Sequence, residues 1–344
     1  MMLTMAEWWV KQGAVVCVFV LREDGAVPEY PIPAGVQVQR LRLIRAHNPL
    51  LSGGHVRRLW ALRRALLVWR PHVVISFQDK LNVTVLLALT GSAVPVVATE
   101  HLVPWRNPLG RGWEGLRRLV YRRAAGVVSP TQAMTEWFQA HVSGRHLTLP
   151  CPAQVRPGGP EMAKRSPVVM AAGRLTAVKG FDLLIGAWGQ ALKNRPDWSL
   201  QIAGEGEERD ALERQIATLG LTRQVTLLGA VPDLPERLKS CALFALSSRH
   251  EAYSMVLCEA LAAGCAVVAA DCPTGPREIL GEPAAGLLVA ADDSAALAAG
   301  LERLISDGAL RVQLSDLALR RAASLTAEAV MPAWDALVAS VARA

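Results

Sequence analysis

Residues 168–182 carry the sequence VVMAAGRLTAVKGFD. The apolar, β-branched run at the start of this stretch predicts a buried strand. Gly173 permits a tight exit from that strand, and a helical pattern follows from Phe181. The stretch therefore predicts a strand, a turn and a helix, which is the unit from which α/β folds with parallel sheets are built.

The same alternation of short strands and amphipathic helices extends over the whole chain. Helices are predicted between the strands, for example at residues 56–69 and 113–124. The predicted strands cover residues 15–21, 73–77, 94–99, 126–129, 146–149, 168–172, 199–203, 225–228, 243–246, 266–269 and 286–289. Such alternation is typical of βα units in a mostly parallel sheet, so the predicted fold class is α/β.

Length and composition predict two domains. The chain has 344 residues, which is more than one compact core usually accommodates. Residues 150–160, PCPAQVRPGGP, contain four prolines and two glycines and predict a linker. We therefore expect two doubly wound, Rossmann-like domains that face a cleft, over residues 1–152 and 153–325. A C-terminal helix over residues 326–344 is expected to pack back toward the first domain. Ligands of such domains bind at the carboxyl ends of the strands.

The N-terminus departs from this pattern. A doubly wound domain opens with a strand and a glycine-rich turn, whereas residues 1–11 predict a helix. That first strand would be central, so its loss would expose unpaired backbone groups and apolar side chains. We expect an N-terminal domain that lacks its first strand, either because the start is placed too late, which we favour, or because the domain is damaged.

Positive charge is concentrated in the first half of the chain. Residues 1–150 hold 18 Lys+Arg and 8 Asp+Glu, a balance of +10, so the remainder carries −3 of the net +7. This excess fits a solvated face, an anionic membrane or lipid-phosphate surface, or nucleic acid. No nucleic-acid-binding motif accompanies the charge, so we expect no nucleic-acid partner.

The expected location is cytoplasmic. The sequence shows neither a signal peptide nor an apolar run of the roughly 18 residues that cross a bilayer. Its six cysteines have no metal-binding or disulfide pattern, which indicates reduced, buried thiols. We expect a cytoplasmic protein that is soluble or peripheral on the inner face of the cytoplasmic membrane.

The strongest functional signal is the stretch EAYSMVLCEALAAG at residues 251–264. Ser254 is a candidate N-cap for a helix that begins at Met255 and is closed by Gly264. The first amides of such a helix have no partner within the helix and suit a phosphate. The start of this helix is therefore a candidate anion site.

Two carboxylates flank that candidate site. Glu251 lies in the loop before the helix, and Glu259 lies about one turn into it. One carboxylate can accept hydrogen bonds from a sugar hydroxyl while the other accepts them from a ribose diol. A solvent-exposed acid is the alternative for Glu259, but its apolar neighbours Leu257, Cys258 and Leu261 argue against full exposure.

Two cations follow the predicted strand at residues 168–172. Arg174 and Lys179 lie on the turn that begins with Gly173. Paired cations are what a diphosphate leaving group requires, because they neutralise the charge that develops as the glycosidic bond breaks. On their own, two cations on a loop are more often solvated.

Weaker candidates lie on other strand ends. Gly204 and Gly206 form half of a dinucleotide fingerprint, which we interpret as a tight turn beside a nucleotide pocket. Val231 lies in a similar loop, where it is a candidate contact for the base. In the first half, His101 ends a strand and is a candidate contact for the donor sugar or its phosphate, although a lone histidine is more often structural.

One further strand end supplies candidates for an acceptor. Asp79 and Lys80 follow the predicted strand at residues 73–77. We assign these two side chains to acceptor binding as a working hypothesis.

With these residues in place, the chain resembles family 4 of the retaining glycosyltransferases, which have the GT-B fold. The Glu-x7-Glu motif of that family matches Glu251 and Glu259, and its Gly-Arg-Leu-x3-Lys-Gly motif matches residues 173–180. Its Gly-x-Gly turn matches residues 204–206, and its strand-end histidine matches His101. The order Ser-Phe-x-Asp-Lys and then Glu-His is similar to bacterial enzymes that add an N-acetylhexosamine to a polyprenyl-linked or surface glycan.

The resemblance implies a role for each candidate. Arg174 and Lys179 would hold the donor diphosphate, Glu259 would hold the ribose, and Glu251 would hold the sugar together with nearby amides. The implied donor site comprises Gly173, Arg174, Lys179, Gly204, Val231, Ser254, Met255, Val256 and Glu259. The implied catalytic residues are Glu251 and His101.

The resemblance also implies the reaction. The donor would be a nucleoside-diphosphate sugar, with UDP favoured over GDP, and no further cofactor and no metal would be needed. The acceptor would be a glycan or a polyprenyl-phosphate-linked glycan. Independently of the resemblance, the basic first half of the chain makes an anionic membrane surface a candidate partner. Retention would proceed by front-face attack assisted by the leaving phosphate.

Two departures from the family pattern leave alternatives open. Residues 150–152 read Pro-Cys-Pro where many relatives have Pro-Asn-Pro, a change confined to the hinge. The missing first strand and its glycine-rich loop bear on catalysis. The alternatives are therefore a non-catalytic, truncated relative that binds a nucleotide sugar or a partner transferase, and a sugar-nucleotide epimerase.

Overall fold

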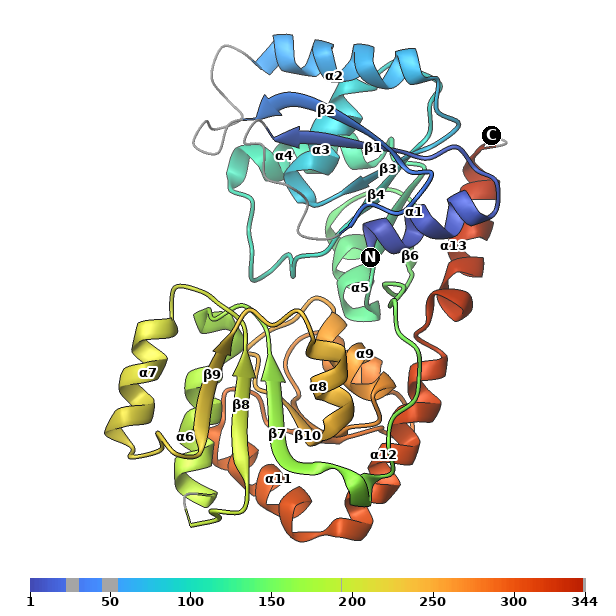
Figure 1. Cartoon of the computed structure of the whole chain (residues 1–344). Helices are drawn as coiled ribbons and strands as arrows, with labels where there is room; N and C mark the ends of the chain where they lie inside the picture. Colours follow the sequence, from blue (N-terminus) through green and yellow to red (C-terminus); the bar gives the residue numbers. More distant parts are fainter. Residues whose placement is uncertain (23–30, 45–54, 193, 343–344) are drawn as a thin grey trace. The chain divides into compact units, whose positions relative to one another are not determined.

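The computed structural model describes residues 1–22, 31–44, 55–192 and 194–342 (Figure 1). The chain divides into two compact units. The first unit consists of Met1–Gln154 and Ala327–Ala344, and the second of Val155–Thr326. The sequence placed these boundaries after residues 152 and 325. Each unit has its own sheet and core, and each is described by itself.

The second unit contains one continuous parallel sheet. Its strands are β7 (Ser166–Ala172), β8 (Ser199–Ala203), β9 (Val225–Gly229), β10 (Cys241–Leu246), β11 (Ala266–Ala270) and β12 (Leu287–Val289). Their order across the sheet is β12-β11-β10-β7-β8-β9. The chain winds outward from β7 to β9 and then returns to β10 beside β7. The connections from these two neighbouring strands run to opposite sides of the sheet, and doubly wound sheets bind their ligands at the carboxyl ends of strands at such a switch point.

The helices of the second unit form two groups. The helix α6 packs against α7 and α11, whereas α9 packs against α8 and α12. Their bounds are α6 (Phe181–Ala191), α7 (Arg209–Thr218), α8 (Leu234–Ser240), α9 (Met255–Ala262), α10 (Gly275–Leu280), α11 (Ser294–Ser306) and α12 (Gly308–Ala323), with short 3-10 helices at η1 (Met162–Lys164) and η2 (Ala177–Lys179). Fully buried Trp188 on α6 and Val169 on β7 belong to one core. This is the doubly wound α/β arrangement that the sequence predicts.

The strands of the first unit are divided between two sheets. They are β1 (Cys17–Arg22), β2 (Gln37–Ile44), β3 (Val74–Phe77), β4 (Val96–Thr99), β5 (Gly126–Ser129) and β6 (His146–Thr148). β1 pairs with β2, and the other four form a separate sheet in the order β3-β4-β5-β6. Within the described residues, β1 and β3 each have a partner on one edge only. Among the described residues, no strand joins these two sheets at the position that a doubly wound order gives to its central strand.

One strand of the first unit was not predicted. β2 carries the sequence QVQRLRLI, in which Gln39, Arg40 and Arg42 interrupt the apolar pattern. It nevertheless pairs in parallel with β1, from Cys17 opposite Gln37 onward. Whether such a segment forms a strand depends on its pairing partner more than on its own hydrophobic pattern.

Helices complete the core of the first unit. They are α1 (Met2–Lys11), α2 (His55–Trp69), α3 (Asp79–Ala88), α4 (Arg111–Tyr121), α5 (Gln132–His141) and α13 (Ala327–Ala342). Successive residues of β4 point to opposite faces: Ala98 joins a core with α2, α3 and α4, while Val97 joins one with α1 and α13. The indole of Trp9 donates to Asp335 at 2.7 Å, so α13 lies against α1.

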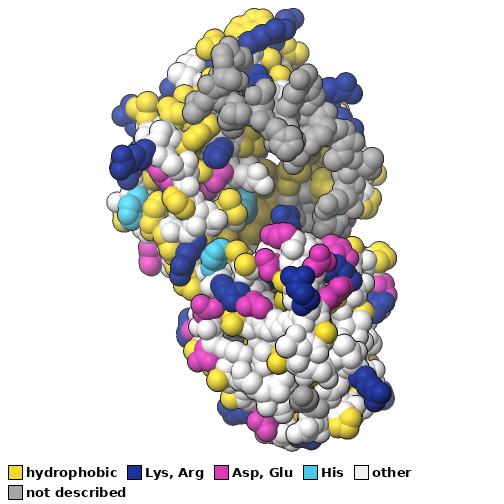
Figure 2. All heavy atoms as spheres, turned by 90° about the vertical axis from the view of Figure 1, so that its left-hand side faces the viewer, with side chains coloured by type: hydrophobic (Ala, Val, Ile, Leu, Met, Phe, Trp, Pro, Cys, Tyr) yellow, Lys and Arg dark blue, Asp and Glu magenta, His cyan; other side chains and the backbone are white. Residues whose placement is uncertain are grey.

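The surface of the first unit includes the outer side of α2. There, hydrophobic and arginine side chains lie together at the top of the view in Figure 2. No helix in the described part of the chain is both long and apolar enough to span a membrane.

Candidate active site

The predicted donor-site residues of the second unit lie at one edge of its sheet. Gly173 follows β7, Gly204 follows β8, Val231 follows β9 and Glu251 follows β10. All of these strands are parallel, so their carboxyl ends meet at the same edge. Strand order therefore brings together residues from four separate sequence motifs.

A charged pair occupies the point where β7 and β10 end. Lys179 Nζ lies 2.6 Å from Glu251 Oε1, and Ser248 Oγ donates to the same oxygen at 2.8 Å. The Glu251 side chain is 8% exposed and that of Lys179 is 25% exposed. Burial strengthens the attraction and makes loss of either partner costly, because the other charge is left unpaired. The two motifs that the sequence assigned to sugar and phosphate thus meet directly.

Arg249 holds the loop that carries Lys179. Its guanidinium donates to both Asp182 oxygens, at 2.8 and 2.7 Å, and to the carbonyl of Ala177 at 2.6 Å. The guanidinium keeps the pKa of the Asp182 carboxyl below its ordinary value. Arg249 therefore ties the start of η2 to the first turn of α6, and Lys179 lies between these two contacts. Arg249 and Ser248 were not among the predicted site residues, although both follow β10 within three residues.

The two glycines after β8 serve a close backbone approach. A Cβ at Gly204 would lie 1.9 Å from the carbonyl oxygen of Gly173, and one at Gly206 would lie 2.2 Å from that of Leu175. The Gly173 amide also donates to Ala203 at 2.9 Å. The turn after β8 is therefore locked onto the loop after β7, which accounts for a Gly-x-Gly pattern without a dinucleotide fingerprint.

The N-terminus of α9 carries the predicted anion-binding amides. Ser254 is the N-cap residue, but its hydroxyl makes no capping bond and, among the described residues, has no hydrogen-bond partner although it is buried. Met255 and Val256 open the helix, so their amides have no acceptor within it. The helix ends at Ala262, and Gly264 adopts a left-handed conformation just beyond it.

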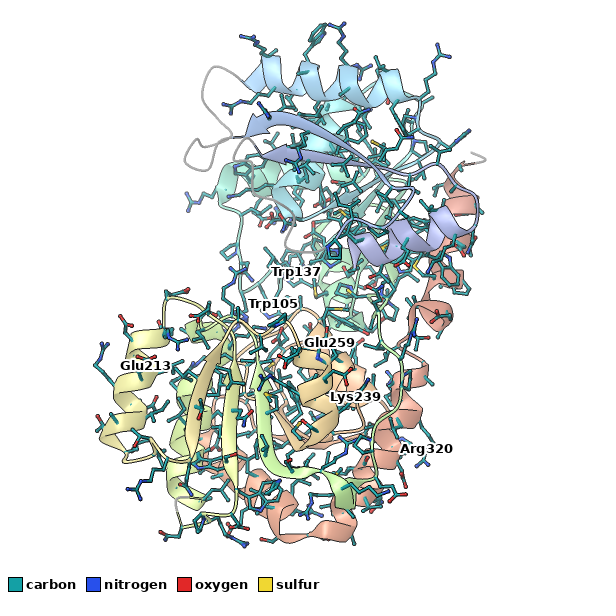
Figure 3. All side chains as sticks on the ribbon, viewed as in Figure 1. Trp105, Trp137, Glu213, Lys239, Glu259 and Arg320 are labelled. Atoms are coloured by element: carbon teal, nitrogen blue, oxygen red, sulfur yellow. The ribbon has the colours of Figure 1, made fainter. Side chains whose placement is uncertain are left out.

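Glu259 lies on α9, remote from Glu213 on α7 (Figure 3). Burial raises the pKa of the Glu259 carboxyl. No side chain in the described residues donates a hydrogen bond to it. Burying part of a carboxylate without a hydrogen-bond donor from the protein costs free energy. Such a carboxylate is suited to accept hydrogen bonds from the hydroxyl groups of a ligand.

The remaining donor-site candidates have looser surroundings. Arg174 is exposed, and its side chain contacts no acceptor within the described residues. Val231 is partly buried in the loop after β9, and the Gly229 carbonyl at the start of that loop accepts from the Gly204 amide at 2.8 Å. Across the described residues, no group of three or more His, Cys, Asp or Glu side chains is placed to hold a metal ion.

In the first unit, the candidates His101, Asp79 and Lys80 lie at the ends of adjacent strands. Phe77 of β3 is in register with Thr99 of β4. The rings of Phe77 and His101 stack with centroids 5.8 Å apart. Asp79 and Lys80 begin α3, immediately after β3. The sheet therefore places the acceptor candidates beside His101.

The hydrogen bonds around His101 fix its tautomer. The Thr99 hydroxyl donates its only proton to the Ser76 carbonyl at 2.9 Å, so it must accept from His101 Nε2 at 3.0 Å. Nδ1 is then an acceptor, with the Cys151 sulfur 4.0 Å away. Burial lowers the pKa of His101 to about 4. His101 is therefore a neutral imidazole with a lone pair on Nδ1.

The residue before this histidine is a buried acid. Glu100 is 1% exposed and accepts hydrogen bonds from the hydroxyl of Tyr121 and from Asn82 Nδ2, the latter at 3.2 Å. Burial raises the pKa of Glu100 to about 7. This cluster was not predicted, because its members lie on or beside three different elements.

Comparison with known proteins assigns the family. The profile for a "Glycosyl transferase 4-like domain" matches residues 1–152, and the profile for "Glycosyl transferases group 1" matches residues 159–321. The chain therefore belongs to the glycosyltransferase family whose two domains these profiles describe. The family resemblance predicted from the sequence is thereby confirmed.

Bacterial proteins are among the relatives of this chain. It is 30% identical over 280 residues to "Exopolysaccharide phosphotransferase SCO2592" of Streptomyces coelicolor, a match that covers 80% of this chain and 29% of that protein. It is 35% identical over 177 residues to a Campylobacter jejuni N-acetylgalactosaminyltransferase named for a diphospho-undecaprenol acceptor, covering 52% of this chain and 47% of that protein. The chain thus matches about half or less of these two relatives.

Solved structures with the same fold confirm the GT-B class. Anabaena HepE, in complex with UDP and glucose, superposes with a TM-score of 0.81 at 21% identity and covers 98% of this chain and 95% of its own. Sucrose-phosphate synthase from Thermosynechococcus elongatus gives 0.82 at 18% identity, covering 98% and 91%. The predicted GT-B fold is therefore correct.

Proposed function

We propose that the protein is a retaining glycosyltransferase that moves a hexose or N-acetylhexosamine from a nucleoside-diphosphate sugar to a glycan or polyprenyl-phosphate-linked acceptor. Its role would lie in bacterial surface polysaccharide or glycoconjugate synthesis. The observation that carries the proposal is the Lys179–Glu251 pair at the carboxyl ends of β7 and β10, beside the N-terminus of α9. The names of the Campylobacter relatives support the acceptor class, and the UDP in the HepE structure supports UDP over GDP.

Each donor group would have a partner in the second unit. Lys179 and Arg174 would neutralise the diphosphate, with the amides at Met255 and Val256 as further donors. Glu259 would accept from the ribose hydroxyls. Without donor, Lys179 is paired with Glu251. A diphosphate would draw Lys179 away, which frees the Glu251 carboxylate to accept from a sugar hydroxyl.

The chemical step would be front-face substitution. The bond between the anomeric carbon and the diphosphate oxygen breaks as the acceptor oxygen bonds to the same face. The acceptor proton passes to the leaving phosphate, whose charge Lys179 and Arg174 stabilise. No metal and no cofactor are required in this scheme. Because His101 is neutral, it would act as a hydrogen-bond partner for the sugar and not as a charge.

Transfer from a panel of UDP- and GDP-sugars to bacterial membrane lipid extract tests the proposal. We expect nucleotide release and a labelled lipid-linked product with one UDP-sugar. Glu251→Gln should abolish both, whereas Glu213→Gln should leave them unchanged, because Glu213 is an exposed ion-paired acid on α7. Equal turnover in both variants would contradict the assignment of Glu251.

A second candidate function follows from the divided sheets of the first unit. A relative that binds a nucleotide sugar without turning it over would need only the second unit's site. Donor binding without transfer to any acceptor tried would favour this non-catalytic candidate. A cytoplasmic location, peripheral on the inner face of the membrane, is part of the main proposal because the proposed acceptor is lipid-linked.

A further inference from the structure

The outer side of α2 exposes large apolar side chains that the fold does not use. Val56 is 79% exposed, Trp60 is 61% exposed and Val68 is 75% exposed. These are three of the four most exposed large hydrophobic side chains in the described residues. Their spacing by multiples of four places them along one side of the helix.

Helix α2 is strongly basic, and part of its positive charge lies among these hydrophobes. The segment from His55 to Arg70 contains five arginines and no acidic residue. The guanidinium of Arg64 lies over the Trp60 ring at 5.7 Å, and exposed Arg57 lies on the same side. A shallow groove of about 490 Å³ is lined by Trp60, Arg63, Arg64, Leu67, Val68 and Arg70. Figure 2 shows this mixture of hydrophobic and basic side chains at the α2 end of the first unit.

The opposite side of α2 anchors the helix in the core. Leu62 and Leu66 are buried in a core that they share with residues of α3, against which α2 packs. Arg63 donates to the carbonyls of Ala88 and Thr90, each at 2.9 Å, which ties α2 to the end of α3. Helix α2 is therefore held in place without its outer apolar side chains.

We propose that the outer side of α2 docks on an anionic lipid bilayer, with Trp60, Val56 and Val68 entering the headgroup region and Arg57 and Arg64 contacting lipid phosphates. Tryptophan and arginine on one face suit the membrane interface, where each finds both apolar and charged surroundings. The absence of acids from this helix favours an anionic surface. The inference rests on the proposed lipid-linked acceptor, because docking would bring the first unit to the membrane that holds it.

Vesicle co-sedimentation of the full chain tests the docking face. We expect binding to phosphatidylglycerol–phosphatidylcholine vesicles, little binding to pure phosphatidylcholine, and loss of binding as salt rises from about 0.1 M to about 1 M. Arg57→Gln with Arg64→Gln should weaken binding on the order of five-fold for each arginine. Val56→Ser with Trp60→Ser and Val68→Ser should weaken it at least ten-fold, roughly.

Matched controls separate this face from general charge. Val312→Ser with Arg320→Gln removes an exposed hydrophobe and an exposed arginine from α12 and should leave binding unchanged. Leu119→Ser with Arg122→Gln makes the same change at α4 and its C-cap; a loss of binding as large as that of the α2 variants would overturn the assignment to α2. Loss of self-association without loss of vesicle binding in the Trp60 variant would show a protein interface instead.

Enzyme turnover distinguishes failure of docking from failure of the proposed function. With a short-chain, water-soluble acceptor, the α2 variants should keep wild-type nucleotide release, while transfer to vesicle-bound acceptor falls with vesicle binding. Vesicle binding that survives all five α2 substitutions would overturn the docking proposal even if transfer is confirmed.

Discussion

The two units follow the same winding rule and differ at the centre of the sheet and in the electrostatics of their strand ends. In the second unit, β7 fills the central position and is paired on both sides, whereas in the first unit β1 and β3 have no described strand between them. The strand ends of the second unit carry a paired cation and anion, Lys179 and Glu251. Those of the first unit carry His101 and Glu100, and burial favours the neutral form of each.

This difference separates two kinds of chemistry. Charges fixed by partners, as at Lys179, are suited to bind and stabilise a phosphate. Groups kept neutral by burial are suited to donate or accept hydrogen bonds near neutral pH. We therefore expect substitutions at the strand ends of the second unit to lower the rate of sugar transfer. The buried groups of the first unit should instead make the free energy of unfolding depend on pH.

The largest expected effect is loss of the second unit's cation. Lys179→Ala should lower transfer on the order of 10²–10³-fold, because the leaving diphosphate loses its buried counter-charge. Lys239→Ala is the matched control: Lys239 pairs with Glu236 at 3.0 Å on the exposed side of α8. Steady-state transfer should be within about two-fold of wild type in the control. A loss in the control as large as that in Lys179→Ala would contradict a specific role of Lys179 in stabilising the leaving diphosphate.

The open edge of the first unit should be visible in hydrogen exchange. The amides of Val74 and Gln78 donate toward β4, so those of Ile75 and Phe77 point to the other edge of β3. Amides of central β7, such as those of Val169 and Ala171, should exchange roughly 100-fold or more slowly than the Ile75 and Phe77 amides. Equal protection would mean that another backbone segment covers β3.

The buried acid of the first unit should give the stability a distinct pH dependence. Burial raises the Glu100 pKa from 4.5 to about 7, so folding favours its protonated form. The free energy of unfolding of wild type minus that of Glu100→Gln should be greatest below pH 4.5. This difference should fall by about 3 kcal/mol as pH rises to about 7.

Denaturant unfolding of both proteins at intervals across that range measures the effect. Exposed Glu136 on α5 offers a control, Glu136→Gln, whose difference from wild type should stay flat. A difference that grows with pH for Glu100→Gln would show that the buried carboxyl is held ionised instead.

The smallest expected effect concerns the positioning of Lys179. Arg249→Lys keeps the charge but loses the two-pronged contact with Asp182, so turnover should fall about ten-fold while the free energy of unfolding changes by about 1 kcal/mol or less. Arg237→Lys is the control, because Arg237 makes an exposed contact with Asp233 on α8. A drop in stability that matches the drop in turnover would indicate a purely structural role for Arg249.

The sequence could predict the elements whose pattern is local. Apolar runs such as residues 266–269 became buried strands, and Gly173 and Gly264 fell at turns. The strand β2 was missed because its register with β1 depends on a partner that periodicity does not reveal. The absence of a described strand between β1 and β3 was predicted, because the order of elements along the chain carries that information.

The candidate site was predictable in part for the same reason. Motifs that follow strands could be assigned to one sheet edge, but the direct pairing of Lys179 with Glu251 depends on side-chain geometry across 72 positions of sequence. Glu100 and Tyr121 meet only after β4 and α4 pack together. Arg249 showed no motif, and its role follows from the fork it makes with Asp182.

The central claim is that the strand ends of the second unit form the donor site, and donor binding tests it most directly. Calorimetric titration of the intact chain with UDP and a UDP-sugar should show saturable binding, weakened about ten-fold or more in Glu259→Gln by loss of a charged hydrogen-bond acceptor. Glu213→Gln, an exposed acid in the same unit, should bind as wild type does. Wild-type affinity in Glu259→Gln, or an equal loss in both variants, would contradict the account.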